Sequence, residues 1–319
     1  MKIVVVDRPC ENPGEIDWSE LSKIGETTIY DDTKQEDIAK VIGDAEIVFI
    51  NKGKITKEVL DACPNIKFIS VIATGFNKID IEYAKQKGIV VSNVPAYGSK
   101  AIGQHACALL LETTNHVAHH DIETRKFRRT NDFDWAFWDY PIVELEYKTM
   151  GVIGLGRIGQ TVAKFGLAMG MDVVAYDSYI NPEMQKLGIN YVSLDQLLAS
   201  ADVISLHCPL TEDNVDMINA DTIAKMKDGV IIVNNSRGGL VDEQALADAL
   251  KSGKVYAAGI DAVKKEPIDK DCPLLYAPNC YITPHISWAA LDCRRRLVKF
   301  AIDNLKAFLA GNPTNVVNK

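Results

Sequence analysis

The sequence predicts an α/β protein made of two doubly wound domains with parallel sheets. Strand-like apolar runs alternate with helix-like amphipathic runs along the chain, the pattern of parallel strands joined by crossover helices. A length of 319 residues exceeds that of a typical single domain. A glycine-rich turn opens a second alternating series near Met150. We expect one discontinuous domain, residues 1–98 plus 290–319, and a second domain over residues 99–289.

Apolar periodicity places the individual elements. In the first domain we expect strands at 3–6, 27–30, 47–50, 68–72 and 89–91, and helices near 17–23, 33–42, 56–62 and 80–86. One long helix is predicted over residues 99–120, with an inward face of Ile102, Ala106, Leu109, Leu110, Thr113 and Val117. A last helix over 291–310 is expected to turn inward Leu297, Phe300, Ala301, Leu305 and Phe308.

Composition and charge exclude several classes of protein. An apolar fraction of 47% and a charged fraction of 24% are ordinary for a soluble protein. A net charge of −8 argues against nucleic-acid binding and against an anionic membrane surface, and no apolar run approaches the roughly 20 residues of a membrane helix. The seven cysteines are odd in number and show no Cys-x-x-Cys spacing, so neither a disulfide framework nor a zinc ribbon is expected. These features predict a cytoplasmic protein.

A dinucleotide-binding fingerprint follows the strand end at Val152-Ile153. It reads Gly154-Leu155-Gly156-Arg157-Ile158-Gly159 and leads into a helical pattern, which is the strand–turn–helix context that the motif requires. The glycines permit a tight turn, the approach of amides to a pyrophosphate and close helix–strand packing, respectively. Asp177, 23 residues after Gly154, is placed to bind a ribose and to repel a 2′-phosphate. We expect a Rossmann domain that binds NAD; from the turn alone, an S-adenosylmethionine enzyme is the alternative.

Three polar side chains follow three strand-like runs. Arg237, Glu266 and His285 come after the runs at 230–233, 257–260 and 281–283. Ligands of open α/β sheets bind beyond the carboxyl ends of the strands, so these groups should converge on one crevice. A guanidinium, a carboxylate and an imidazole suit a small carboxylic acid with a carbonyl to be reduced. Singly, each has a structural alternative: an Arg237–Asp242 ion pair, a solvated Glu266, or a His285 that caps a strand.

The segment 234–243, Asn-Asn-Ser-Arg-Gly-Gly-Leu-Val-Asp-Glu, makes a family resemblance recognisable. With Asp261, Glu266-Pro267 and Thr283-Pro284-His285, it resembles the D-isomer-specific 2-hydroxyacid dehydrogenases over essentially the whole chain. Residues 135–145 look most like the glycerate dehydrogenase (hydroxypyruvate reductase) branch of that family. The resemblance implies a Rossmann NAD-binding domain, a smaller flavodoxin-like substrate domain and a homodimer.

The resemblance also implies residue roles. Arg237 would bind the substrate carboxylate, and His285, steadied by Glu266, would give a proton to the carbonyl oxygen. Substrate contacts are further expected at Asn51, Thr74 and Gly75, and no metal is expected. The implied cofactor contacts are Thr74, Gly154, Gly156, Arg157, Ile158, Gly159, Asp177, His207, Cys208, Pro209, Asn214, Asn235, Ser236, Arg237, Asp261 and His285.

Several positions depart from common family usage or carry other signals. Gly103-Gln104 stands where Ala-Glu or Ala-Gln is more frequent, Asn214 where Thr is frequent, and Tyr147 where Gly is frequent. His116, His119 and His120 have the i, i+3, i+4 spacing of a helical zinc site, but no cysteine or carboxylate obviously completes the site. The aromatic segment 133–140 could be core, and we favour its burial in the dimer.

The expected function is NAD(H)-dependent reduction of a small 2-keto acid, hydroxypyruvate, to its D-hydroxy acid, D-glycerate. D-lactate and D-3-phosphoglycerate dehydrogenases are the enzymatic alternatives. A non-catalytic, NAD-sensing, corepressor-like binding protein is the alternative from another class, although it would not need Arg237, Glu266 and His285 together.

Overall fold

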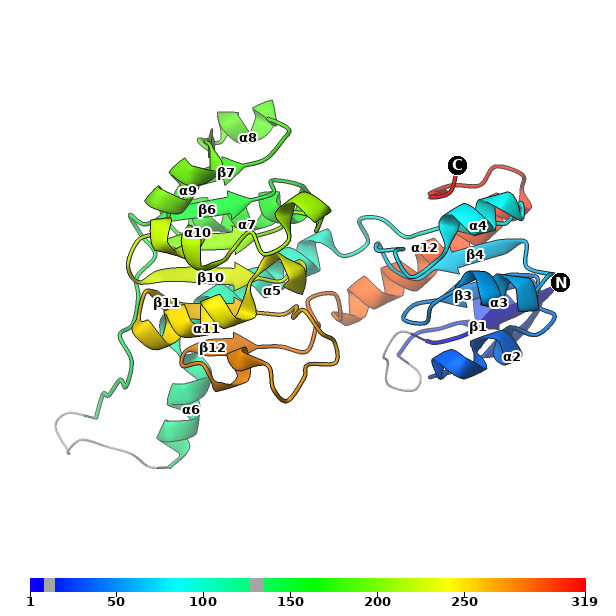
Figure 1. The fold of residues 1–319 in the computed structure, drawn as a ribbon, viewed down its shortest axis with the longest axis horizontal. Coiled ribbons are helices and arrows are strands. Elements are labelled where there is room, and N and C mark those ends of the chain that lie inside the picture. The colour runs from blue at the N-terminus through cyan, green and yellow to red at the C-terminus, as the bar shows by residue number, and fades with distance from the viewer. Residues whose placement is uncertain (9–14, 127–134) are drawn as a thin grey trace. The chain divides into compact units, whose positions relative to one another are not determined.

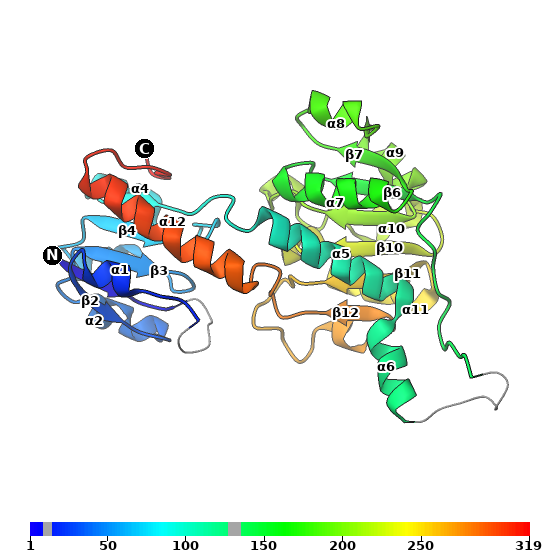
Figure 2. The same ribbon diagram turned by 180° about the vertical axis from the view of Figure 1, so that it is seen from behind.

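The computed structural model describes residues 1–8, 15–126 and 135–319. It divides into two compact units, Met1–Gly98 with Ala289–Lys319, and Ser99–Trp288 (Figure 1 and Figure 2). Each unit is a parallel sheet flanked by helices, which confirms the predicted fold class. Phe133 and Asp134 of the aromatic segment lie outside the described residues. Within the described part of the chain, no helix is long and apolar enough to cross a membrane.

The first unit contains a five-stranded sheet in the order β2-β1-β3-β4-β5, which is the flavodoxin-like order. Its strands are β1 (Lys2–Val5), β2 (Glu26–Ile29), β3 (Ile47–Ile50), β4 (Phe68–Val71) and β5 (Val90–Ser92). Its helices are α1 (Ser19–Ser22), η1 (Gln35–Asp37), α2 (Ile38–Ile42), α3 (Lys57–Ala62), α4 (Ile81–Gln86) and α12 (Leu291–Leu309). The helix predicted over 33–42 is therefore a 3-10 turn followed by a short α-helix.

The second unit contains a seven-stranded sheet in the order β12-β11-β10-β9-β6-β7-β8, a doubly wound order that reverses between β6 and β9. Its strands are β6 (Thr149–Ile153), β7 (Asp172–Tyr176), β8 (Asn190–Tyr191), β9 (Val203–Leu206), β10 (Val230–Asn234), β11 (Val255–Ile260) and β12 (Cys280–Ile282). Its helices are α5 (Ser99–Asn115), α6 (Val117–Arg125), α7 (Arg157–Ala168), α8 (Pro182–Lys186), α9 (Leu194–Ser200), η2 (Glu212–Asn214), α10 (Ala220–Lys225), η3 (Gly238–Leu240), α11 (Glu243–Ser252) and η4 (Pro273–Tyr276).

Apolar runs form the strands of the second unit because both faces of its sheet are covered. Helices α5 and α7 lie on one face, and α9, α10 and α11 lie on the other, as the two opposite views show. All five residues of β10 are therefore buried. Full burial of one Val or Ile side chain stabilises the fold by about 1.5–3 kcal/mol relative to exposure. The candidate site lies at the turns that follow these strands.

The prediction of one long helix over residues 99–120 is wrong in one respect, because the helix is broken at His116. That residue has a left-handed φ of 50°, so α5 ends before it and α6 begins after it. The His116 side chain is buried, and its ring nitrogens hydrogen-bond to the hydroxyls of Tyr256 and Tyr281. These bonds offset the strain of a left-handed backbone. Val117, predicted to face inward, is consequently 61% exposed.

The neighbouring histidines have polar partners within the protein. His119 Nε2 pairs with Asp139 at 2.8 Å, and His120 Nδ1 lies 2.8 Å from the carbonyl oxygen of His116. The Tyr256 hydroxyl also donates to the carbonyl of Pro141 at 2.6 Å. Among the described residues, no group of three His, Cys, Asp or Glu side chains is placed to hold a metal. The histidines instead fasten residues 139–141 to the sheet.

One predicted inward residue of α12 lies outside the core. Leu297, Ala301 and Leu305 are buried as expected, but Phe300 is 37% exposed. Its ring lies under the ammonium group of Lys299, 6.0 Å from the ring centroid. Phe308 does pack inward, since it stacks on Phe68 with ring centroids 4.7 Å apart. The inward face of α12 is therefore rotated from the predicted one, since Val298 and Ile302 are buried and Phe300 is not.

Two of the departures from family usage lie at positions where the structure shows what a glycine does. A Cβ on Gly103 would lie 2.7 Å from Cγ2 of Thr161, so glycine lets α5 approach α7 closely. Tyr147 has a φ of +65°, a conformation that glycine adopts without a steric cost. Glycine is thus the easier residue at position 147, and this chain carries a strained tyrosine there.

Candidate active site

The glycine-rich turn joins β6 to α7 where the strand order of the second unit reverses. Gly154 has a φ of +90°, and a Cβ there would lie 2.6 Å from the backbone nitrogen of Cys208. A Cβ on Gly159 would lie 2.1 Å from the carbonyl oxygen of Gly154, so packing requires both glycines. A Cβ on Gly156 would meet no atom within 4 Å, and Gly156 is the N-cap of α7 without a side-chain cap. The turn therefore leaves a helix N-terminus open to an anion.

Asp177, directly after β7, orders the same turn. Its Oδ2 accepts a hydrogen bond from the backbone N–H of Leu155 at 2.6 Å, and its Oδ1 accepts one from that of Tyr179 at 2.9 Å. An ionised carboxylate has about four acceptor sites, so sites remain for ribose hydroxyls. The sequence predicted the ribose role of Asp177 and missed its hold on the glycine turn.

Two of the predicted cofactor residues hydrogen-bond to the backbone of the loop after β9. The Ser236 hydroxyl donates to the carbonyl of Cys208 at 2.7 Å, and Asn214 Nδ2 donates to that of Pro209 at 2.8 Å. Burial raises the pKa of the Cys208 thiol, which argues against a nucleophilic thiolate. Burial also lowers the pKa of His207 to about 3, so this imidazole stays neutral. His207 and Cys208 therefore contribute uncharged side chains to this loop.

Two predicted cofactor residues carry a buried polar atom without a hydrogen-bond partner among the described residues. These atoms are His207 Nδ1 and Asn235 Oδ1. Buried polar atoms are nearly always paired, so each such atom calls for an explanation. Asn235 Nδ2 donates to the carbonyl of Ile102 at 2.9 Å, which orients the amide with its oxygen unpaired. Together with the glycine turn and Asp177, these atoms fit a bound dinucleotide.

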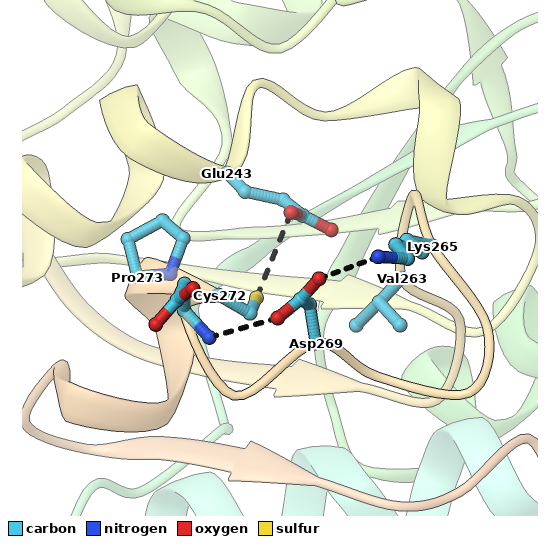
Figure 3. A pocket seen from close by; sticks show the side chains of 7 residues that line it. Glu243, Val263, Lys265, Asp269, Cys272 and Pro273 are labelled. Atoms are coloured by element: carbon cyan, nitrogen blue, oxygen red, sulfur yellow. Dashed lines mark hydrogen bonds and ion pairs between the residues drawn. The ribbon is translucent and has the colours of Figure 1, made fainter.

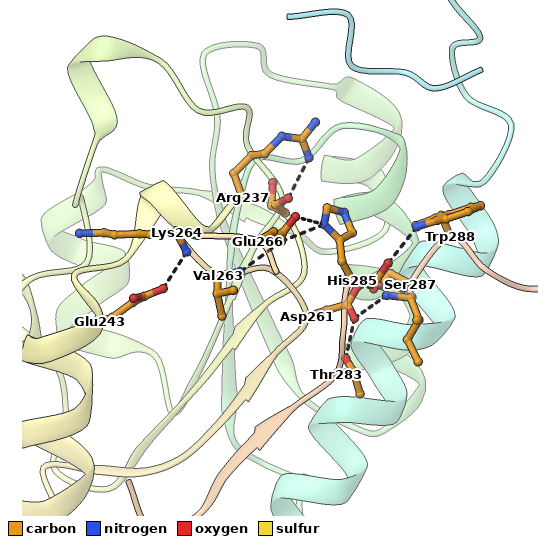
Figure 4. A network of polar contacts seen from close by, with 12 residues as sticks. Arg237, Glu243, Asp261, Val263, Lys264, Glu266, Thr283, His285, Ser287 and Trp288 are labelled. Atoms are coloured by element: carbon orange, nitrogen blue, oxygen red, sulfur yellow. Dashed lines mark hydrogen bonds and ion pairs between the residues drawn. The ribbon is translucent and has the colours of Figure 1, made fainter. Parts of the chain in front are cut away.

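The structure brings Arg237, Glu266 and His285 together after the adjacent strands β10, β11 and β12 (Figure 4). Both oxygens of Glu266 lie 2.9 Å from Nδ1 of His285. The two side chains are each 41% exposed, so the pair is accessible to a small molecule. Because Nδ1 is engaged by the carboxylate, Nε2 is the nitrogen left for a substrate.

The surroundings of Arg237 do not contain the Arg237–Asp242 ion pair that was its structural alternative. Its Nη1 donates to the carbonyl of Ser236 at 2.8 Å, and the side chain is exposed. Asp242, the partner considered from the sequence, instead caps α11 by accepting from the backbone N–H groups of Gln244 and Ala245. The guanidinium thus keeps donors available beside Glu266 and His285.

Electrostatics keep the Glu266 carboxyl ionised. Burial alone would raise its pKa, but the hydrogen bond and charge of His285, with the charge of Arg237, outweigh burial and lower the pKa from 4.5. Glu266 is therefore an anion at neutral pH. The Nδ1 edge of His285 therefore faces a negative charge.

A pocket of about 250 Å³ lies beside the segment that carries Glu266 (Figure 3). Glu243 accepts a hydrogen bond from the backbone N–H of Lys264 at 2.7 Å and thereby anchors this segment to α11. The lining residues are Glu243, Val263, Lys265, Asp269, Asp271, Cys272 and Pro273. None of them belongs to the predicted site, so the pocket flanks the candidate site without forming it.

Three predicted substrate contacts lie in the first unit, after β3 and β4. The Asn51 side-chain amide donates to the carbonyl of Ile72, and the Thr74 hydroxyl donates to that of Val94 at 3.0 Å. Gly75 has no positive φ, so a left-handed backbone is not the reason for a glycine there.

Sequence reasoning missed Asp7, which shapes the loop of Asn51. This buried carboxylate accepts from the backbone N–H groups of Asn51, Lys52 and Gly53 at 2.6–2.7 Å. Burial raises the pKa of Asp7, and the three hydrogen bonds oppose that shift. An acid directly after a buried strand was the available signal.

Comparisons with known proteins find relatives over the whole chain. Residues 107–287 match the family model described as "D-isomer specific 2-hydroxyacid dehydrogenase, NAD binding domain". The chain is 53% identical to a hydroxypyruvate reductase of Blautia hydrogenotrophica over 100% of both chains. It is 37% identical to a glycerate dehydrogenase of Methylorubrum extorquens over 88% of each. A crystal structure of D-lactate dehydrogenase from Aquifex aeolicus, complexed with NAD and lactic acid, matches with a TM-score of 0.84 and 31% identity, over 100% of this chain and 99% of that one.

Proposed function

This chain belongs to the D-isomer-specific 2-hydroxyacid dehydrogenase family and is an NAD-dependent oxidoreductase, and we propose that it reduces hydroxypyruvate to D-glycerate. The 53% identity to a hydroxypyruvate reductase over the full chain supports this substrate. The juxtaposition of Arg237 with the Glu266–His285 pair carries the proposed chemistry. The guanidinium can bind the carboxylate of the keto acid. The imidazole can give the carbonyl oxygen the proton that it needs on reduction.

The three side chains divide the proposed reaction among them. Bound NADH supplies the hydride that reduces the carbonyl carbon. Arg237 binds the substrate carboxylate with its planar pair of donors and polarises the adjacent carbonyl. His285 gives its Nε2 proton to the carbonyl oxygen as charge develops there. Glu266 holds the ring through Nδ1, and in the reverse reaction neutral His285 accepts the proton.

The NAD contacts are proposed on the turn and loops described above. Asp177 is assigned to the ribose, which favours NAD over NADP because a carboxylate repels a 2′-phosphate. Asn51, Thr74 and Gly75 stay proposed substrate contacts of the first unit. The other proposed cofactor residues are Thr74, Gly154, Gly156, Arg157, Ile158, Gly159, His207, Cys208, Pro209, Asn214, Asn235, Ser236, Arg237, Asp261 and His285.

NADH oxidation with four keto acids tests the proposed substrate. Hydroxypyruvate, glyoxylate, pyruvate and phosphohydroxypyruvate would be compared by kcat/KM, and the product would be resolved by chirality. We expect the highest kcat/KM with hydroxypyruvate and a D-glycerate product. A clear preference for pyruvate or phosphohydroxypyruvate would reassign the chain to D-lactate or D-3-phosphoglycerate oxidation. No oxidation with any of the four would favour the corepressor-like alternative.

Replacing Glu266 by glutamine is expected to lower kcat for reduction, because a neutral amide holds the Nδ1 edge of His285 less strongly than a carboxylate does. The depressed pKa of Glu266 also implies a stability effect. The contribution of Glu266 to stability is present above the unfolded pKa of about 4.5 and is lost as the pH falls through the folded pKa. An unaltered kcat in Glu266→Gln would contradict the assigned partnership.

We infer that the protein is a cytoplasmic homodimer. Trp135 and Trp138 are 73% and 66% exposed. They directly precede residues 139–141, which are held by His119 and Tyr256. Aromatic side chains are enriched in interfaces, which supports burial of the two tryptophans in a second copy. The free cysteines among the described residues suit a reducing compartment. A monomer by light scattering at micromolar concentration would contradict the dimer.

A further inference from the structure

The backbone at His285 is held in an unusual conformation. Its φ is +55°, in the left-handed region that residues with a Cβ seldom adopt. Its N–H donates to the carbonyl of Thr283 at 2.9 Å, and its carbonyl accepts from Nε1 of Trp288 at 2.8 Å. Such a conformation persists only where the surrounding structure determines it. The neighbours of His285 therefore decide where its imidazole lies.

Asp261 ties down the chain on both sides of His285. This buried carboxylate follows β11, and its Oδ1 accepts from the Thr283 hydroxyl at 2.6 Å. The backbone N–H groups of Ile286 and Ser287 donate to its Oδ1 and Oδ2, at 2.8 Å each. Figure 4 shows Asp261 beside Thr283 and Ser287. One carboxylate thus fixes residues 283, 286 and 287 around position 285.

The two hydrogen-bond partners of the Thr283 hydroxyl show which atom of His105, on α5, must donate. The Thr283 hydroxyl has one hydrogen, which it gives to Asp261, so its oxygen must accept from its other neighbour. That neighbour is Nε2 of His105, 3.1 Å from the Thr283 oxygen. Nε2 also lies 3.6 Å from Oδ1 of Asp261. The His105 nitrogen therefore carries a proton, and a donor chain runs from α5 through Thr283 to the carboxylate.

We propose that His105 is a positioning residue for reduction, acting through Thr283 and Asp261 on the segment that presents His285. The proposal rests on the proposed role of His285 as proton donor. Without the Nε2 donor, the Thr283 hydroxyl is free to turn away from Asp261, and residues 283–287 lose one of their fixed points. A displaced imidazole weakens an interaction made in the transition state, so kcat falls while KM changes little.

Two variants separate the donor from the shape of the side chain. His105→Gln keeps an N–H donor at a similar reach, whereas His105→Leu has a similar size and no donor. We expect kcat to fall about tenfold in His105→Leu, with both KM values within about twofold, and to recover largely in His105→Gln. A solely structural role of residue 105 would not separate kcat from KM in this way.

The indole resonance of Trp288 gives a readout that needs no activity. Its N–H reports the hydrogen bond to the His285 carbonyl, and Trp288→Phe assigns it among the four tryptophans. We expect this resonance to shift in His105→Leu and to stay in place in His105→Gln. Thr283→Val, which removes the hydroxyl and keeps the shape, should shift it similarly. Adding His105→Leu to Thr283→Val should then change little more, because both act on one chain of bonds.

Each outcome decides the matter. Unaltered kcat and an unmoved resonance in His105→Leu would overturn the proposal. Equal losses in His105→Gln and His105→Leu would also overturn it, because side-chain volume rather than the donor would then matter. If the unaltered protein reduces none of the keto acids, the proposed function fails, and the Trp288 resonance alone decides whether His105 holds this segment.

Discussion

Replacing His285 by alanine is expected to lower kcat for keto-acid reduction by about 10³-fold. The variant lacks the group that gives a proton to the carbonyl oxygen, and general acids of this kind contribute roughly 10²–10⁴-fold. NADH affinity, measured by fluorescence titration, should fall by much less than kcat, because the other proposed cofactor residues are unchanged. Thermal unfolding should stay within a few degrees, since the side chain is 41% exposed.

His285→Asn is the matched control for the backbone at this position. Asparagine tolerates a left-handed φ better than alanine does, and it keeps an N–H donor, but it does not act as an acid. If proton donation is the task of His285, both variants lose turnover to a similar degree. A kcat near that of the unaltered protein in either variant would remove His285 from the mechanism.

Replacing Arg237 by leucine is expected to lower kcat/KM for the keto acid by about 10³-fold. The variant loses paired charge-assisted hydrogen bonds to the carboxylate and the polarisation of the carbonyl. Arg237→Lys keeps the charge without the planar pair of donors, so a loss of about 10²-fold is expected. KM for NADH should move far less than KM for the keto acid in both variants.

Lys225→Met controls for the loss of an exposed cation in the same unit. Lys225 lies on α10 and pairs with Asp195 at 2.7 Å. Exposed ion pairs contribute little, so this variant should behave as the unaltered protein does. If Arg237→Leu kept kcat/KM within a few-fold of Lys225→Met, Arg237 would have no role in substrate binding.

The parts of the fold that follow from local pattern could be predicted from the sequence. The run at 230–233 is short, entirely apolar and β-branched, which favours a strand covered on both faces, and the structure places it in β10. The break between α5 and α6 could not be predicted. It depends on His116 meeting Tyr256 and Tyr281, which are 140 and 165 positions away in the chain. Helical periodicity continues through His116 and carries no information on those partners.

The same distinction holds for the candidate site. Parallel strands end at one edge, so residues shortly after β10, β11 and β12 had to converge, and Arg237, Glu266 and His285 do lie together. The support behind His285 was not predictable, because His105 and Thr283 are 178 positions apart. Asp7 was missed for a similar reason. Its carboxylate oxygens accept hydrogen bonds from backbone N–H groups that are 44–46 positions away in the chain. Strand ends predict where side chains gather, whereas hydrogen bonds across the sequence require the fold.

A crystal structure of the protein with NAD and oxamate, an unreactive 2-keto acid analogue, tests the central claim most directly. The account predicts the oxamate carboxylate on the guanidinium of Arg237 and the amide carbonyl oxygen within hydrogen-bond distance of Nε2 of His285, with Glu266 on Nδ1. An analogue bound with that oxygen on another donor, and with residue 285 remote from it, would contradict the account.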